Sequence, residues 1–296
     1  MGTTRPTARR TMSGTSRRTD RNPYPKAGAP LLNTLSILFV GDIVGKGGRR
    51  AVAALVPELR RELDCALVVA NGENVAGGGG MTRKCVNALL EGRVDVITAG
   101  DHIWDQKDFV DEIRLCPEVL RPANVCPAQP GRGCGVFEAR DGTRVGVLSL
   151  LGRTFIATQA DCPFAAADAA IETLQEAGAT MILVDFHAEA SSEAIAMGRY
   201  LDGRVSAVLG THTHVPTADE QILPQGTAYQ TDVGMVGARD SVLGRQVSAV
   251  LHRFSTGMPA RFAVVEHGIR MNATLVKIKP DTGRAVHIER IVRDYD

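Results

Sequence analysis

The first part of the chain alternates short apolar runs with amphipathic segments, and this alternation limits most strongly how it can fold. The apolar runs predict buried strands over residues 35–40, 66–70 and 94–98. The amphipathic segments have helical periodicity and cover residues 49–63, 82–90 and 106–115. Thr82 is suited to cap the second of these helices. This order of elements implies parallel strands joined by right-handed crossovers.

The second half of the chain is richer in strands. A hairpin is predicted from residues 135–139 and 144–151, around the turn Asp141-Gly142. Helices are expected over 165–177 and 192–201, and buried strands over 180–186 and 205–209. Short strands then dominate, at 221–223, 227–230, 260–266, 273–279 and 285–292. We therefore expect an α/β protein in which two sheets pack face to face with helices outside.

Charge is distributed unevenly along the 296 residues. The net charge is +1, yet residues 1–34 carry six arginines, one lysine and a single aspartate, a net charge of +6, which leaves −5 for the rest. We expect residues 1–34 to be a disordered basic arm. The alternative is a transit peptide, since such peptides have a similar composition. We expect residues 35–296 to form one domain. No run approaches the roughly 18 apolar residues of a membrane helix, so a membrane-spanning protein is excluded.

The cysteines indicate a reducing compartment. There are six of them, none in a C-x-x-C pair, and a chain of this length needs no disulfides. No apolar stretch of a secretory signal follows the basic start. We therefore expect free thiols and a cytoplasmic location. The sequence gives no oligomeric state, and a homo-oligomer stays open.

Metal-binding residue types follow the predicted strands at the points where they end. These residues are Asp42, Glu73, Asn74, Asp101, His102, His187, His212 and His214. Ligands of open α/β sheets bind at the carboxyl ends of strands, so these five segments should meet at one edge. His212-x-His214 is the strongest single signal, because residues two apart on an extended segment face the same side.

The combination of histidine, carboxylate and amide suits Zn, Mn or Fe. Six or seven such ligands are too many for one tetrahedral ion and indicate two ions that share a bridging carboxylate. Three other kinds of site lack their sequence motifs. The chain has no P-loop for nucleotide phosphates, no G-x-G-x-x-G opening a helix for a dinucleotide and no G-x-S-x-G for a serine nucleophile. We interpret His252, His267 and His287 as structural or surface residues.

The ordered motifs resemble those of the calcineurin-like metallophosphoesterases, in particular the YmdB-like bacterial phosphodiesterases. The matching stretches are Gly41–Gly45, Asn71–Gly77, Gly100–Asp105, Asp185–Glu189, Gly210–Val215 and Thr231–Met235. The resemblance implies a four-layer α/β/β/α sandwich of two mixed sheets with two divalent ions, Fe or Mn in preference to Zn or Mg. It assigns Asp42, Glu73, Asn74 and His214 to one ion and Glu73, Asp101, His187 and His212 to the other, with His102 as proton donor.

Two positions depart from the pattern of these relatives. Val44 stands where the superfamily has a histidine, and Asp101 stands where the family has asparagine.

The resemblance implies hydrolysis of cyclic nucleotides, 2′,3′-cyclic AMP in particular, by hydroxide shared between the two metal ions. The alternative is a regulatory nucleic-acid- or nucleotide-binding protein with a vestigial metal site, in which the basic arm contacts RNA or another nucleic acid.

Overall fold

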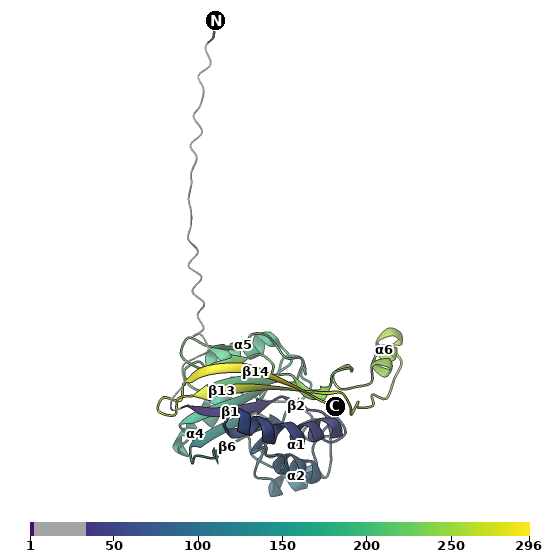
Figure 1. Cartoon of the computed structure of the whole chain (residues 1–296), viewed down its shortest axis with the longest axis horizontal. Helices are drawn as coiled ribbons and strands as arrows, with labels where there is room; N and C mark the ends of the chain where they lie inside the picture. The colour runs from purple at the N-terminus through teal and green to yellow at the C-terminus, as the bar shows by residue number, and fades with distance from the viewer. Residues whose placement is uncertain (3–33) are drawn as a thin grey trace. The chain divides into compact units, whose positions relative to one another are not determined.

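Alternate side chains of the first strand, β1 (Leu35–Val40), enter two different hydrophobic cores. Ile37 and Phe39 belong to one core, whereas Leu38 and Val40 belong to another. Successive side chains of a strand point to opposite faces, so a strand that is apolar on both faces must lie in an inner layer. The computed structural model, which describes residues 1–2 and 34–296, has this arrangement (Figure 1).

The first sheet has eight strands and contains both the first and the last strand of the described residues. Besides β1, its strands are β2 (Asp42–Ile43), β3 (Cys65–Asn71), β4 (Val96–Thr98), β5 (Val119–Leu120), β12 (Met235–Ala238), β13 (Ile269–Ile278) and β14 (Ala285–Tyr295). The order is β2-β12-β13-β1-β3-β4-β5, and β14 pairs with β13. Strands β1, β3, β4 and β5 run parallel, whereas β13 pairs with β1 in the antiparallel direction. The sheet is therefore mixed.

The second sheet has six strands in the order β10-β11-β9-β8-β7-β6. Their bounds are β6 (Cys134–Glu138), β7 (Arg144–Leu151), β8 (Met181–His187), β9 (Ala207–Thr211), β10 (Gln221–Ile222) and β11 (Ala228–Gln230). The central strands β7, β8, β9 and β11 are parallel, and the edge strands β6 and β10 pair with them in the antiparallel direction. This sheet is mixed as well.

Helices cover the outer faces of both sheets. They are α1 (Gly45–Glu62), α2 (Arg83–Glu91), α3 (Phe109–Glu112), the 3₁₀ turn η1 (Ile113–Leu115), α4 (Pro163–Glu176) and α5 (Ser191–Tyr200). A further helix, α6 (Val247–Thr256), projects from the sandwich (Figure 1). Val56 of α1 and Leu89 of α2 pack on the first sheet, while Ile171 of α4 and Met197 of α5 pack on the second. A third core, with Phe39 and Leu183, separates the two sheets. The predicted four-layer α/β/β/α sandwich is therefore confirmed.

Several elements differ from the sequence prediction. Helix α1 begins at Gly45 instead of residue 49, because its first turn, which holds three glycines, packs against β12. The helix predicted over 106–115 is reduced to α3 and η1. The strand predicted over 260–266 is wrong, because this segment has only an isolated bridge between Val264 and Arg245. Helix α6 has no counterpart in the sequence prediction.

The remaining expectations concern the arm, the thiols and the membrane. The predicted disordered arm, residues 1–34, lies outside the described residues except at its two ends. All six cysteines are free, as expected. Among the described residues, no helix combines the length and apolar character needed to cross a bilayer. Thr82 caps α2 as predicted, since its side chain accepts a hydrogen bond from the backbone of Cys85.

A short loop, residues 231–234, ties the two sheets together. The backbone of Val233 donates to Gly210 at the end of β9 (2.9 Å), and the backbone of Asp42 donates to Gly234 (3.0 Å). The carbonyl oxygen of Thr231 occupies the space that a β-carbon at Gly210 would need. Gly210 is therefore required for this close approach of the two backbones.

We predict that Gly210→Ala lowers the free energy of unfolding by at least about 1–3 kcal/mol, as expected when a group is forced into filled space. The added methyl group must push the Thr231 carbonyl away, which disturbs the connection between the sheets. Thermal or urea denaturation of the purified variant measures the loss. A melting temperature equal to that of the wild type would contradict this account of the loop.

Candidate metal centre

The strand ends of both sheets bring all eight predicted site residues to one region. Asp42 begins β2, Glu73 and Asn74 follow β3, and Asp101 and His102 follow β4 in the first sheet. The second sheet contributes His187, the last residue of β8, and His212 and His214, which follow β9. The expectation that these segments meet is confirmed, because hydrogen bonds and ion pairs connect residues from both sheets.

Four of these side chains form a tight cluster of possible metal ligands. Glu73, Asp101, His187 and His212 each offer one ligand atom, and these atoms all lie within 4.8 Å of one another. The Nε2 atom of His187 is 3.2 Å from Glu73 Oε1, 3.2 Å from Asp101 Oδ1 and 3.0 Å from His212 Nδ1. Two imidazoles and two carboxylates suit a transition-metal ion.

Three further residues lie beside this cluster. The Nε2 atom of His214 is 3.1 Å from the side-chain oxygen of Asn74. Asp42 is completely buried, and its Oδ2 accepts a hydrogen bond from the backbone of His212 (3.1 Å). Its Oδ1 has no hydrogen-bond partner among the described residues. A buried carboxylate oxygen without a partner is costly, and a cation is the natural partner for it.

The electrostatics of the cluster also favour a bound cation. Burial by itself lowers the pKa of His187, but the nearby Glu73, Asp101 and Asp42 carboxylates more than reverse this effect, and its pKa lies well above its usual value. Burial raises the pKa of Asp42 in turn, against the attraction of His187. Three carboxylates, those of Asp42, Glu73 and Asp101, thus surround His187, and this donor set fits a divalent cation.

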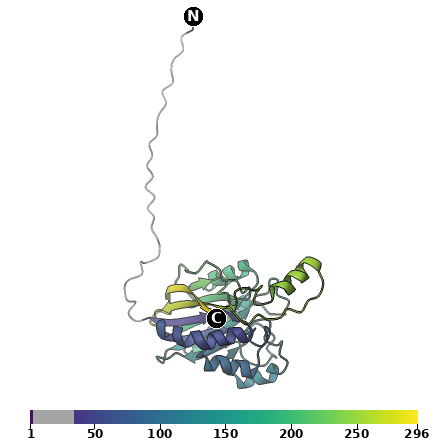
Figure 2. The ribbon, with the colours of Figure 1, turned by 45° about the vertical axis from the view of Figure 1, so that its right-hand side comes forward.

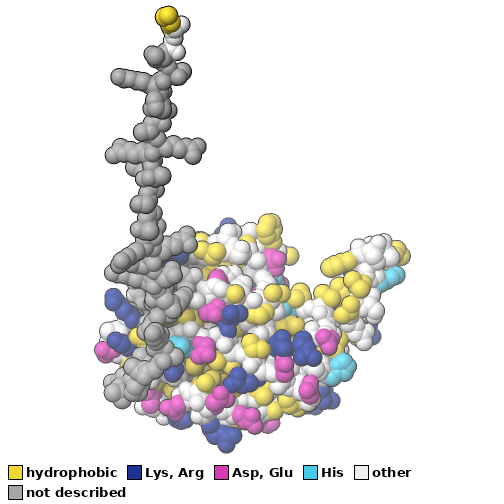
Figure 3. Space-filling model, turned by 45° about the horizontal axis from the view of Figure 1, so that its top comes forward, with side chains coloured by type: hydrophobic (Ala, Val, Ile, Leu, Met, Phe, Trp, Pro, Cys, Tyr) yellow, Lys and Arg dark blue, Asp and Glu magenta, His cyan; other side chains and the backbone are white. Residues whose placement is uncertain are grey.

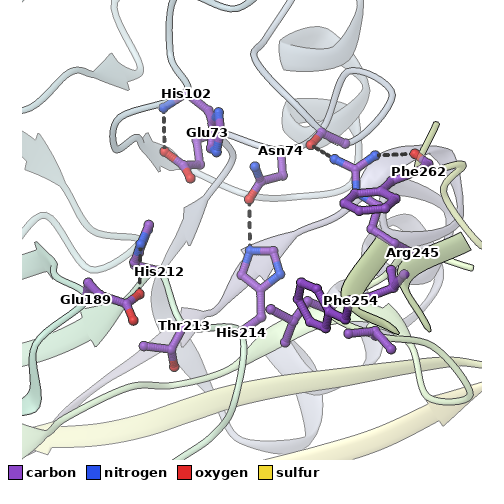
Figure 4. Close-up of a pocket in the computed structure, with 14 residues that line it drawn as sticks. Glu73, Asn74, His102, Glu189, His212, Thr213, His214, Arg245, Phe254 and Phe262 are labelled. Atoms are coloured by element: carbon purple, nitrogen blue, oxygen red, sulfur yellow. Dashed lines mark hydrogen bonds and ion pairs between the residues drawn. The ribbon is translucent and has the colours of Figure 1, made fainter. Parts of the chain in front are cut away.

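The two histidines after β9 reach the site in a different way from that predicted. Both have left-handed backbone conformations, with φ of 109° at His212 and 65° at His214, so this segment is not extended. As a result, the two rings diverge. His212 faces Asp101 and Glu189, while His214 faces Asn74 (Figure 4). The premise of two rings on one side is wrong, although both residues lie at the site.

Asp232 holds this irregular segment in place. Its Oδ2 accepts hydrogen bonds from the backbone and the hydroxyl of Thr213, both at 2.9 Å, and its Oδ1 accepts one from the backbone of Gly234 (2.7 Å). Burial raises the pKa of Asp232 to about 6, against these hydrogen bonds. The motif Thr231–Met235 therefore has a structural function, which is to fix the turn that carries both histidines.

A buried hydrogen-bond network beneath the cluster was missed by sequence reasoning. His187 Nδ1 lies 2.8 Å from the hydroxyl of Thr211, which donates to Asp185 (2.7 Å). Asp185 also accepts hydrogen bonds from Asn71 of the first sheet (3.0 Å) and from Thr98. These contacts fix the orientation of the His187 ring. The signal was visible in the sequence, since Asp185 interrupts an otherwise apolar run.

His102 lies at the edge of the cluster, with its side chain 45% exposed. Its backbone donates to Glu73 Oε2 (3.2 Å), and its Nδ1 is 2.8 Å from Asp105 Oδ2. Contact of Nδ1 with a carboxylate leaves Nε2 free to exchange a proton. By contrast, His252 and His267 are exposed, and His287 contacts Glu289, so these three histidines lie outside the centre as expected.

A cavity of about 390 Å³ opens over the centre. Glu73, Asn74, His102, His212 and His214 line one side of it, and the opposite side consists mainly of apolar residues from the segment that contains α6. Figure 4 shows the two sides facing each other. The volume lies within the range of ordinary small-molecule sites, so the centre is accessible to a ligand of nucleotide size.

Known proteins share both the sequence and the fold. The sequence model of the YmdB-like proteins matches residues 38–291. A 2′,3′-cyclic-nucleotide 2′-phosphodiesterase of Bacillus subtilis is 44% identical over 264 residues, covering 88% of this chain and 98% of the relative.

Two solved structures are similar as well. One is a hypothetical protein of Thermus thermophilus, with a TM-score of 0.82 and 41% identity, covering 88% of this chain and 100% of that one. The other is a novel phosphatase of Mycoplasma pneumoniae, with a TM-score of 0.82 and 32% identity, covering 88% and 94%. With its four layers and its centre at the strand ends, this chain belongs to the YmdB-like family of metallophosphoesterases.

Proposed function

We propose that the protein is a metal-dependent phosphodiesterase that hydrolyses 2′,3′-cyclic nucleotides at a centre of two divalent ions. The observation that carries this proposal is the cluster of Glu73, Asp101, His187 and His212, in a chain 44% identical to a 2′,3′-cyclic-nucleotide 2′-phosphodiesterase. Free thiols support a cytoplasmic location. The substrate is a small phosphodiester.

The ligands divide into two sets that share one carboxylate. Asp42, Asn74 and His214 would hold one ion together with Glu73, and Asp101, His187 and His212 would hold the other together with the same Glu73. Bound divalent ions supply Lewis-acid stabilisation of the phosphate oxygens and an activated water nucleophile. Iron or manganese suits this mixture of oxygen and nitrogen donors.

His102 donates a proton to the ribose oxygen that leaves phosphorus. Asp105 contacts Nδ1 of the ring and thereby holds the proton-donating Nε2 toward the cavity. Protonation matters most when the leaving group is a poor one, such as an alkoxide. His102 and Asp105 thus act on the leaving group, whereas the other seven site residues hold the metal ions.

The direct test is hydrolysis by the protein loaded with Mn²⁺ or Fe²⁺. We expect turnover of 2′,3′-cyclic AMP and two metal ions per chain by elemental analysis. Parallel assays with 3′,5′-cyclic AMP and bis(p-nitrophenyl) phosphate define the selectivity. A metal-loaded protein that binds nucleotide without turnover would support the regulatory alternative, in which the site is vestigial.

We predict that Glu73→Gln abolishes turnover and lowers the metal content. Glu73 is 1% exposed, and a neutral amide of the same size cannot share charge between two cations. Elemental analysis and the cyclic AMP assay measure both effects. Glu91→Gln, an exposed position at the end of α2, is the control and should behave as wild type. Full activity of Glu73→Gln with two ions retained would refute the bridging role.

We predict that His102→Ala keeps both metal ions but slows hydrolysis of 2′,3′-cyclic AMP by roughly 10²–10⁴-fold, as is typical for loss of a general acid. The loss should be much smaller with bis(p-nitrophenyl) phosphate, because p-nitrophenolate leaves without a proton. Asp105→Asn should show the same dependence on the leaving group in weaker form. Equal losses for both substrates would indicate that His102 is a ligand or a structural residue.

We predict that Asp101→Asn retains two metal ions and activity, whereas Asp101→Ala loses one ion. Asparagine offers an oxygen at the same reach, and it is the family residue at this position. Removal of one negative charge also weakens the repulsion of an anionic substrate, so KM should fall. Metal analysis and steady-state kinetics of both variants measure these effects. Two ions and normal kinetics in Asp101→Ala would remove Asp101 from the ligand set.

A further inference from the structure

The cavity over the metal centre has two chemically different sides. One side is polar and carries the metal-ligand candidates, whereas Val242, Leu243, Val250, Phe254 and Phe262 line the other. A simple phosphodiester needs only the polar side. The apolar side therefore has to be explained by another part of the ligand, or by packing within the protein.

The apolar side belongs to a segment that projects from the sandwich. Residues 239–268 connect β12 to β13, and α6 lies at the far end of this connection (Figures 1 and 2). Apolar side chains are concentrated on the projection (Figure 3). Within α6 only Val250 is buried, and Phe254 is 78% exposed although it lines the cavity. Internal packing therefore does not account for Phe254.

Arg245 fastens this segment to the glycine-rich loop beside the metal ligands. Its terminal nitrogens donate to the carbonyl oxygen of Phe262 (3.2 Å) and to that of Gly78 (Figure 4). A β-carbon at Gly78 would collide with the guanidinium group, and Gly78 has a φ of 88°. The backbone at Gly78 is thus shaped for this contact, which fixes the distance between the apolar side and the metal ligands.

We propose that Phe254, together with Phe262 and Leu243, binds the base of the nucleotide while the phosphate lies at the metal centre. This inference rests on the proposed phosphodiesterase function. A nucleoside cyclic phosphate is itself two-sided, with a charged phosphodiester at one end and a flat base at the other. An exposed aromatic ring beside a polar centre provides the stacking surface that such a base requires.

The same apolar side of the cavity indicates that the subsite discriminates only weakly between different bases. Arg245 is the only charged residue among the six lining residues of this segment, and two of its five N–H groups donate to the backbone carbonyls of Phe262 and Gly78. Val242, Leu243, Val250 and the two phenylalanines offer no side-chain hydrogen bond. We therefore expect these apolar residues to hold any base by its flat face, with purines bound only modestly better than pyrimidines because they stack over a larger area.

The test compares substrates with and without a base. The metal-loaded wild type, Phe254→Ala and Phe254→Trp are assayed with 2′,3′-cyclic AMP, 2′,3′-cyclic UMP and methyl ribofuranoside 2′,3′-cyclic phosphate, which lacks a base. Leu251→Ala is the matched control, because Leu251 is an exposed residue of α6, 58% accessible, that does not line the cavity.

We expect Phe254→Ala to lower kcat/KM for 2′,3′-cyclic AMP by about 5- to 150-fold, mainly through KM, in line with the loss of one stacked base. The substrate without a base should be unaffected, Phe254→Trp should retain wild-type KM, and Leu251→Ala should match wild type throughout. Cyclic UMP should stay within about tenfold of cyclic AMP for the wild type.

Two results would overturn the base subsite and leave the proposed function intact. One is unchanged kinetics of Phe254→Ala with cyclic AMP, and the other is an equal loss for the substrates with and without a base. A wild-type protein that hydrolyses none of the three substrates would instead refute the proposed function, and the base subsite with it.

Discussion

The carboxylate of Asp185 is the interaction on which the rest of the centre depends. It is completely buried, and it accepts hydrogen bonds from Asn71 and Thr98 of one sheet and from Thr211 of the other. Burial raises its pKa, because removal from water disfavours the charged form. The hydrogen bonds offset that cost and join the two sheets below His187. The sandwich is thus locked together by polar contacts at the end where the proposed metal ligands gather.

The centre combines rigid and irregular backbone. Glu73, Asp101 and His187 follow or end strands, whose positions the two sheets determine. His212 and His214 instead depend on left-handed backbone that Asp232 stabilises. Strained conformations of this kind persist only where the surroundings enforce them, and they concentrate at functional sites. Asp232 therefore contributes to the site without being one of the proposed ligands.

The sequence predicted the sandwich and the location of the site because both depend on local patterns. Buried strands are visible as apolar runs, and the carboxyl ends of parallel strands converge. Three features depend on contacts between distant residues, and local patterns did not reveal what these contacts are. Asp185 has partners far along the chain, residues 260–266 form no strand because no neighbouring strand pairs with them, and α6 has little buried surface to mark it. The two histidines after β9 lie at the site as expected, but the geometric reason for expecting them there was wrong.

The position of β1 has a consequence for how the chain is made. One side of β1 pairs with β3, which follows soon after, but the other side pairs with β13, about 230 residues later. At roughly 5–20 residues per second, a ribosome needs ~10–50 s to synthesise the intervening chain. During that time β1 presents an apolar strand with an unpaired edge, the kind of surface that promotes aggregation. The second edge of β1 is closed only once β13 has emerged, close to the end of synthesis.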